Sequence, residues 1–197
     1  MKLPVIRFVV VSFVLLSSGC AGTNFIRATD DSLVLGQTTQ EQIKARLGSP
    51  FQEGVVTKNE QQLKTSNYAY ANAGGGADAD GVIPARSQGF YFFNDKLVGY
   101  EFTSSYKEDS TNFDSGLISQ IKKGTSTRSD VVRLLGNPGG KYIYPVIDNN
   151  NEQGVNYMYT QTRGSAFSLK FYQKILVITF DKDDVVTKVD YTESGQK

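Results

Sequence analysis

The stretch of sequence that decides the fold is GQTTQEQIKARLGSP at residues 36–50, because it returns as GTSTRSDVVRLLGNP at residues 124–138. Gly, Thr, Leu, Gly and Pro recur at equivalent places with a shift of 88 residues. The recurring positions are Gly36, Thr39, Leu47, Gly48 and Pro50 in the first copy and Gly124, Thr127, Leu135, Gly136 and Pro138 in the second. An internal repeat of this kind indicates two copies of one structural unit.

Each copy of the repeat predicts a short helix with defined ends. Thr39 and Thr127 are suited to cap the helix, and Gln42 and Asp130, three residues later, can complete a capping box. The apolar residues that follow each cap lie four apart and share one helix face, which we expect to pack on a sheet. The glycine then permits the turn that ends the helix, and the proline prevents the helix from resuming.

The repeat continues beyond the helix. Asn-Tyr-Ala-Tyr at residues 67–70 returns as Asn-Tyr-Met-Tyr at residues 156–159, and Phe-Tyr-Phe-Phe at residues 90–93 corresponds to Val-Ile-Thr-Phe at residues 177–180. Each of the last two runs is followed by a charged turn and a second apolar run, which is typical of a β-hairpin. Each copy therefore continues into antiparallel strands.

These patterns predict an α+β fold with two tandem modules, each a pair of short helices packed on a three- or four-stranded antiparallel sheet. We expect the first module at residues 30–107 and the second at residues 111–193. Apolar residues at helical spacing over 117–121 predict the first helix of the second pair. A lone module of this size could bury only a small core.

The N-terminus has the order of a secretory signal peptide over residues 1–19. Lys2 and Arg7 precede an apolar run over residues 8–16, and small residues lead to Cys20. The apolar run is well short of the ~20 residues that a membrane-spanning helix needs, which disfavours an uncleaved anchor. The pattern resembles a bacterial lipoprotein signal, in which the cysteine becomes the first residue of the mature protein and carries acyl chains.

The resemblance implies lipidation at Cys20 with an N-acyl diacylglycerol group, and we expect no other cofactor. Ser17 stands where the lipoprotein motif prefers Leu, which is a mild departure. Because no Asp follows the cysteine, the resemblance implies sorting to the outer membrane, with the protein facing the periplasm. Residues 20–29 show no periodicity and are expected to form a lipidated tether.

The composition excludes several classes of chemistry. The chain has no histidine and one cysteine, so it lacks the Ser-His-Asp and Cys-His nucleophile arrangements and every zinc site with a histidine ligand. Removal of residues 1–19 leaves 19 basic against 20 acidic residues, without the clustered basic face of a nucleic-acid-binding protein. We expect a protein that is not an enzyme, binds no metal and has no nucleic-acid partner.

The combination of Gly-x-x-Thr, a capped helix, Leu-Gly-x-Pro, Tyr-x-Tyr and a Phe-Asp hairpin in a lipoprotein resembles the SmpA/OmlA (BamE) lipoprotein family. The same helix-helix-plus-sheet unit occurs in tandem in β-lactamase inhibitor proteins, which are regarded as part of one structural superfamily. The resemblance covers nearly all of residues 30–193. It implies a non-catalytic binding module at the inner surface of the outer membrane, in the best-known case an accessory of the machinery that inserts β-barrel proteins.

The chain departs from this family in having two modules where BamE has one. The matching positions are helix caps, turns and core residues. The resemblance therefore implies the fold but does not identify the residues of a binding surface. Three functions are weighed. The first is a scaffold or accessory that binds an envelope protein, in β-barrel insertion or in a secretion or cell-wall complex. The second is a periplasmic inhibitor or sensor that binds a soluble enzyme through its sheet surfaces. The third is an enzyme that uses carboxylates, but the sequence contains no pair of carboxylate residues at a suitable spacing.

A comparison of the two copies separates the expected core from the expected surface. At a shift of 87 residues, Phe93 aligns with Phe180 and Tyr91 aligns with Ile178. These residues share one face of their strand because successive side chains alternate between faces. We therefore expect that face to be the core.

The opposite face carries Phe90 and Phe92 in the first copy and smaller side chains in the second. One hypothesis is that the first sheet exposes an aromatic patch, helped by Tyr68 or Tyr70, as a protein-docking surface. The alternative is that these rings pack against the second module or a long loop.

The segment from Ala71 to Ser87 predicts a mobile loop, which includes the stretch from Gly74 to Asp80. It contains three consecutive glycines, and it lacks the Lys-Ser/Thr ending of a phosphate-binding loop. Asp78 and Asp80 have only part of the ligand spacing of a calcium loop, so no metal site is expected there.

Overall fold

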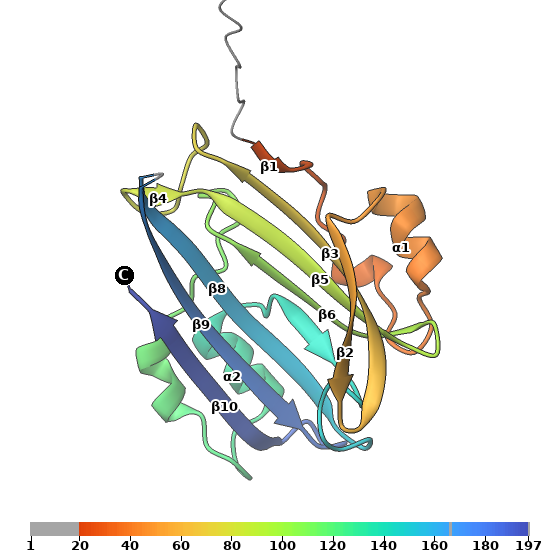
Figure 1. Cartoon of the computed structure of the whole chain (residues 1–197). Helices are drawn as coiled ribbons and strands as arrows, with labels where there is room; N and C mark the ends of the chain where they lie inside the picture. The colour runs from red at the N-terminus through yellow and green to blue at the C-terminus, as the bar shows by residue number, and fades with distance from the viewer. Residues whose placement is uncertain (1–19, 166, 197) are drawn as a thin grey trace, which may run out of the picture.

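A computed structural model describes residues 20–165 and 167–196 of the protein, and in it an antiparallel sheet carries two short helices (Figure 1). The signal peptide expected at residues 1–19 lies outside the described residues. The strands are β1 (Cys20–Gly22), β2 (Gln52–Lys58), β3 (Gln61–Asn72), β4 (Val82–Ile83), β5 (Ala85–Phe93), β6 (Lys96–Ser104), β7 (Gly140–Tyr142), β8 (Gln153–Ser165), β9 (Ser168–Phe180) and β10 (Val186–Gly195). The helices are α1 (Gln40–Leu47) and α2 (Arg128–Leu135), each preceded by a 3₁₀ turn, η1 (Asp30–Ser32) and η2 (Ser115–Gln120).

The ten strands of the described residues form one sheet. Its order is β1-β3-β5-β6-β7-β8-β9-β10, with β2 also beside β3 and β4 also beside β8. The strands of the first repeat therefore meet those of the second at β6 and β7, and β4 of the first repeat pairs with β8 of the second. The two sheets that the repeat predicted are continuous.

Where β6 meets β7, the seam between the two repeats consists of two residue pairs. Gly99 pairs with Tyr142, and Tyr100 pairs with Lys141. A Cβ atom at Gly140 would lie 2.0 Å from the carbonyl oxygen of Tyr100, which is far inside van der Waals contact. The strands can therefore approach one another here only because residue 140 has no side chain.

Both helices cover the same face of this sheet. Phe90, Tyr100, Lys141, Val155 and Ile178 are successive cross-strand partners, so their side chains point to one side. Two of them, Phe90 and Tyr100, belong to the core cluster beneath α1, and two, Val155 and Ile178, belong to the cluster beneath α2. The other face of the sheet carries no helix (Figure 1).

The helix ends confirm the capping prediction in both repeats. Thr39 and Gln42 form a capping box, as do Thr127 and Asp130. The two helices end at glycines with positive φ, 81° at the first and 80° at the second.

The tyrosines of the repeated Asn-Tyr sequence have a role that the sequence did not reveal. The Tyr68 hydroxyl donates to the carbonyl oxygen of Gly48 at 2.9 Å, and the Tyr157 hydroxyl donates to that of Gly136 at 2.8 Å. Each tyrosine thus satisfies a carbonyl that the end of its helix leaves without an intrahelical partner.

The helix pair expected in each module is not found in the described residues. Each repeat has one α-helix of eight residues, and the preceding segment forms only the 3₁₀ turn η1 or η2. The α+β class holds, but the sheet dominates the structure. The apolar residues at 117–121 lie in or directly after η2, whose six residues are too few for a stable α-helix.

The expected core face of the hairpin was wrong by one residue. Phe92, not Phe93, is the equivalent of Phe180, because both belong to the cores beneath the helices at the shift of 88 residues that the helix motif also shows. Phe90 then corresponds to Ile178. Because side chains alternate along a strand, the shift of 87 residues exchanged the two faces.

The segment expected as a tether packs on the first repeat. β1 pairs with the end of β3, and Phe25 and Ala28 are buried in the core beneath α1. The backbone of Ala28 exchanges two hydrogen bonds with the buried side chain of Gln88, at 2.9 and 2.8 Å. Residues 22–29 therefore belong to the folded domain.

Phe90→Ala should lower the free energy of unfolding by about 3–5 kcal/mol, because the ring is completely buried and its removal leaves a cavity. Phe167→Ala is a matched control, since that ring is 100% exposed and its loss should change stability by about 0.5 kcal/mol or less. Urea denaturation followed by circular dichroism measures both. Equal stability of the two variants would contradict the core assignment.

Candidate protein-binding surfaces

The aromatic residues expected to form a docking patch are core residues. Phe90 and Phe92 are 0% and 1% exposed and lie beneath α1, and Tyr68 is also buried. Tyr70 is partly buried and stacks on Tyr106, with 6.2 Å between ring centroids. The docking hypothesis for this patch is therefore wrong: Phe90, Phe92 and Tyr68 lie in the core beneath α1, and Tyr106 packs on the ring of Tyr70.

The loop from Gly74 to Asp80 is held by contacts at Asp78. The carboxylate of Asp78 accepts a hydrogen bond from the Tyr159 hydroxyl at 3.0 Å and another from Ser110. The hydroxyl donors come from β8 and from the connection between the repeats. Asp78 is thus used to fasten the loop across the seam.

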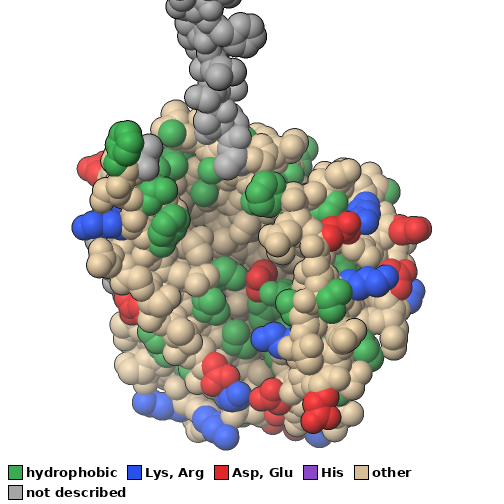
Figure 2. All heavy atoms as spheres, viewed as in Figure 1, with side chains coloured by type: hydrophobic (Ala, Val, Ile, Leu, Met, Phe, Trp, Pro, Cys, Tyr) green, Lys and Arg blue, Asp and Glu red, His purple; other side chains and the backbone are tan. Residues whose placement is uncertain are grey.

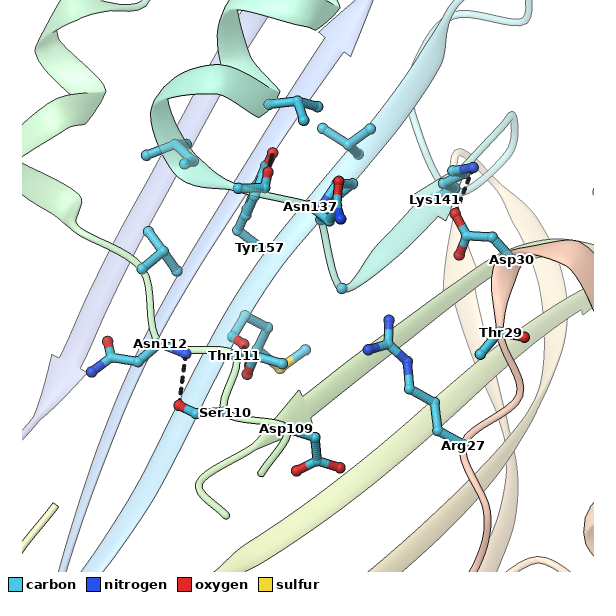
Figure 3. Close-up of a pocket in the computed structure, with 18 of the residues that line it drawn as sticks. Arg27, Thr29, Asp30, Asp109, Ser110, Thr111, Asn112, Asn137, Lys141 and Tyr157 are labelled. Carbon is cyan, nitrogen blue, oxygen red and sulfur yellow. Dashed lines mark hydrogen bonds and ion pairs between the residues drawn. The ribbon is translucent and has the colours of Figure 1, made fainter. Parts of the chain in front are cut away.

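A groove lies on the helical face at the seam and has a volume of about 770 Å³. We call it the seam groove (Figure 3). It is bounded by residues 27–31 of the first repeat, by residues 109–113 of the connection, and by α2 with residues 136–139. The groove exists because each helix covers only its own half of the continuous sheet.

The seam groove has one apolar wall and one polar wall. Val132 and Leu135 of α2, together with Val155 of β8, form the apolar side. Asp109 and Asn112 lie on the opposite side (Figure 3). Such a surface can hold a polypeptide by apolar contact along one edge and hydrogen bonds along the other.

A charged cluster fixes the first-repeat side of the seam groove. Asp30 forms an ion pair with Lys141 at 2.7 Å and accepts a hydrogen bond from the Tyr100 hydroxyl at 2.8 Å. Burial by itself raises the pKa of Asp30, but the hydrogen bonds from Lys141 and Tyr100 outweigh it, so the pKa is lowered below 3.8. The guanidinium of Arg27, which also lines the groove, lies 4.3 Å above the centroid of the Phe102 ring.

A second hollow, of about 420 Å³, lies on the helix-free face. We call it the concave-face hollow; Figure 2 shows this face of the molecule hollowed near its centre. Glu101 lies in it and accepts hydrogen bonds from two tyrosines, Tyr91 at 3.0 Å and Tyr142. Burial and the nearby Glu101 carboxylate raise the pKa of both tyrosines, so both remain hydrogen-bond donors at neutral pH.

One buried acceptor in the concave-face hollow has no partner. Asn156 is 1% exposed and lines the hollow, and its Oδ1 atom makes no hydrogen bond in the structure. A buried amide oxygen without a partner is costly, which makes this atom a place where a ligand donor would be favoured. Met158 and Ile175 supply apolar surface beside it.

Sequence reasoning missed the residues of the concave-face hollow. The available signal was Gly99, a glycine inside a strand, which often marks close approach by another group. A Cβ atom there would lie 2.8 Å from the ring of Tyr142. Neither Glu101 nor Asn156 belongs to a sequence motif that indicates a binding site.

Comparison with known proteins supports the resemblance inferred from the motifs. Residues 111–190 match the family described as the outer membrane protein assembly factor BamE domain. The second half of the chain is therefore BamE-like, and the matched residues fall within the second module expected at 111–193. No curated protein matches the chain.

A solved structure with a similar course is a crystal structure of a candidate beta-lactamase inhibitor protein from Streptococcus mutans. It aligns over 80% of this chain and 83% of its own, at 12% sequence identity and a TM-score of 0.42.

Two further observations concern the described residues. No helix in residues 20–165 and 167–196 is long and apolar enough to cross a membrane. Within the same ranges, no group of three or more cysteine, aspartate or glutamate side chains is placed to hold a metal ion.

Asp30→Asn should destabilise the protein at neutral pH and have less effect in acid. Because the pKa of Asp30 is lowered on folding, its stabilising contribution is present above the ordinary carboxyl pKa of 3.8 and is lost as the pH falls through the folded-state value. Thermal melts of both proteins between about pH 7 and about pH 3 measure the difference. Lys141→Met should reproduce the effect, and a difference that stays constant down to acid pH would contradict the assignment.

Proposed function

We propose that the protein is a non-catalytic, lipid-anchored accessory of the outer membrane that faces the periplasm and binds an envelope protein during assembly. The observation that carries this proposal is the match of residues 111–190 to the BamE domain of outer membrane protein assembly factors. The lipoprotein-type signal that ends at Cys20 supports the anchor and the location. Insertion of β-barrel proteins is the leading process, and a secretion or cell-wall complex is the next.

The seam groove is the proposed docking surface. It lies largely within the matched residues, but residues 27–31 of the first repeat complete it. The second repeat alone would lack the side of the groove that residues 27–31 form. Two repeats in one sheet therefore give the protein a binding surface that neither repeat carries alone.

The occupant that fits the seam groove is an extended segment of a partner protein. The groove has an apolar wall on α2 and a polar wall at residues 109–112, and charged side chains of both signs line its rim. Arg27, Lys141 and Asp30 can pair with charges on the partner and set its register.

A second candidate function is inhibition or sensing of a soluble periplasmic enzyme. The observation that favours it is the concave-face hollow, which is lined by the partly exposed Ile175, by Met158 and by Asn156, whose buried Oδ1 atom has no hydrogen-bond partner. A partner loop that carries a hydrogen-bond donor would complete this site.

Affinity capture from gently solubilised envelopes, with identification of the retained proteins, tests the proposed function. We expect the lipidated protein to retain an envelope assembly complex that the Cys20→Ser variant does not retain. Asn137→Arg, which places a long side chain at the exposed rim of the seam groove, should remove the partner without loss of fold.

Ile175→Arg, in the concave-face hollow, is the matched control. If a soluble enzyme is retained with and without the lipid anchor, and Ile175→Arg removes it while Asn137→Arg does not, the inhibitor function replaces the scaffold. Thermal melts of both variants establish that each is folded.

A further inference from the structure

The hairpin between β8 and β9 ends in exposed apolar side chains. Phe167 is 100% exposed, Phe171 is 62% exposed and Leu169 is 46% exposed. Leu169 and Phe171 are two apart along β9, so their side chains point to one side of the hairpin, and Phe167 lies in the turn directly before β9. We call them the apolar tip. A group of neighbouring exposed apolar side chains indicates an interaction site, whereas a single exposed apolar residue does not.

The apolar tip lies at the same end of the sheet as Cys20. Cys20 pairs with Asn72 at the end of β3, and the backbone N–H of Asn72 donates to the carbonyl oxygen of Pro84 at 3.1 Å. The preceding residue, Ile83, pairs with Thr162 of β8, a few residues before the tip. Figure 1 shows β1, β4 and the end of the β8–β9 hairpin together at one end of the molecule.

The backbone of the anchor residue is paired with this end of the sheet. Because β1 pairs directly with β3, no free linker separates Cys20 from the sheet. A lipid on Cys20 would therefore hold this end of the sheet, and no other, against the membrane surface. The apolar tip would then be brought to the bilayer together with the lipid.

Other features at this end suit a lipid surface. Phe51 is 64% exposed and lies beside Ala69 and Ala71, next to the place where β1 pairs. Lys170 is exposed and points to the other side of the hairpin from Leu169 and Phe171, so its aliphatic stem can lie along the bilayer while its ammonium group reaches water. Figure 2 shows hydrophobic side chains gathered over this end of the molecule.

We propose that the apolar tip inserts into the lipid bilayer next to the Cys20 anchor and fixes the orientation of the protein on the membrane. The inference rests on the lipid anchor of the proposed function. An N-acyl diacylglycerol group has three acyl chains, which are enough to hold the protein on the membrane, so the contribution of the tip is to orientation. Phe167 and Phe171 make this contact with the bilayer, and the seam groove and concave-face hollow are left facing the periplasm.

Fluorescence of a single introduced indole tests the insertion. The chain contains no tryptophan, so Phe167→Trp creates a unique reporter at the tip. The lipidated protein is reconstituted on phosphatidylcholine vesicles, with and without brominated acyl chains. On unbrominated vesicles we expect the indole to emit at a shorter wavelength than in solution. On brominated vesicles we expect most of this emission to be quenched, because the bromine atoms reach only indoles that lie within the bilayer.

Val55→Trp is the matched control. Val55 is similarly exposed at 61% and pairs with Lys64, eight residues or about 26 Å along β3 from Asn72. Its emission should be unchanged by brominated lipid. Emission of the indole at position 167 that is unquenched while the protein floats with the vesicles would overturn the insertion.

Flotation separates a failure of this inference from a failure of the proposed anchor. If the protein does not float with vesicles, the lipid anchor fails, and the free thiol of Cys20, the single cysteine of the chain, can be joined to a maleimide lipid. Quenching at position 167 on those vesicles supports insertion, and its absence overturns it. A shift of the indole emission to shorter wavelength that appears without vesicles and grows with protein concentration would show that the tip binds a second copy of the chain. That result would overturn the proposal.

Discussion

The architecture depends on the close approach of two backbones at the seam. A Cβ atom at Gly139 would lie 2.5 Å from the Phe102 carbonyl oxygen, and one at Gly140 would lie 2.0 Å from that of Tyr100. Because both positions lack side chains, β7 can pair with β6 and carry the second repeat into the sheet of the first. The groove on one face and the hollow on the other both lie across or beside this junction. A pair of separate modules would have neither.

The sequence predicted the parts of the fold that local chemistry determines. The capping boxes at Thr39 and Thr127, the helix-ending glycines and the hairpin strands are set by neighbouring residues, and the structure contains them. The core face of the hairpin could not be decided in this way, because Phe90–Phe93 has an aromatic ring at every position and no alternation to read. The fusion of the sheets also escaped prediction, since it depends on strands that lie far apart in the chain.

The candidate sites were less predictable than the fold. Glu101, Tyr142 and Asn156 come from three strands, and nothing in the sequence relates them before the sheet brings them together. The residues expected to form a binding patch were conspicuous because they were aromatic. The physical reason for aromatic residues at those positions is that they form the core beneath α1. The repeated tyrosines illustrate the same point, since their hydroxyl groups serve the helix ends.

The docking of residues 22–29 onto the first repeat has a consequence for how an anchored molecule would meet its partner. No length of chain is left for a flexible linker between β1 and the first repeat, because β1 is paired with β3 and both Phe25 and Ala28 are buried in the core. A protein held in this way cannot sample the depth of the periplasm. If the protein is anchored as proposed, its encounters would be confined to the neighbourhood of the membrane, and a partner would be found by lateral diffusion along the membrane plane.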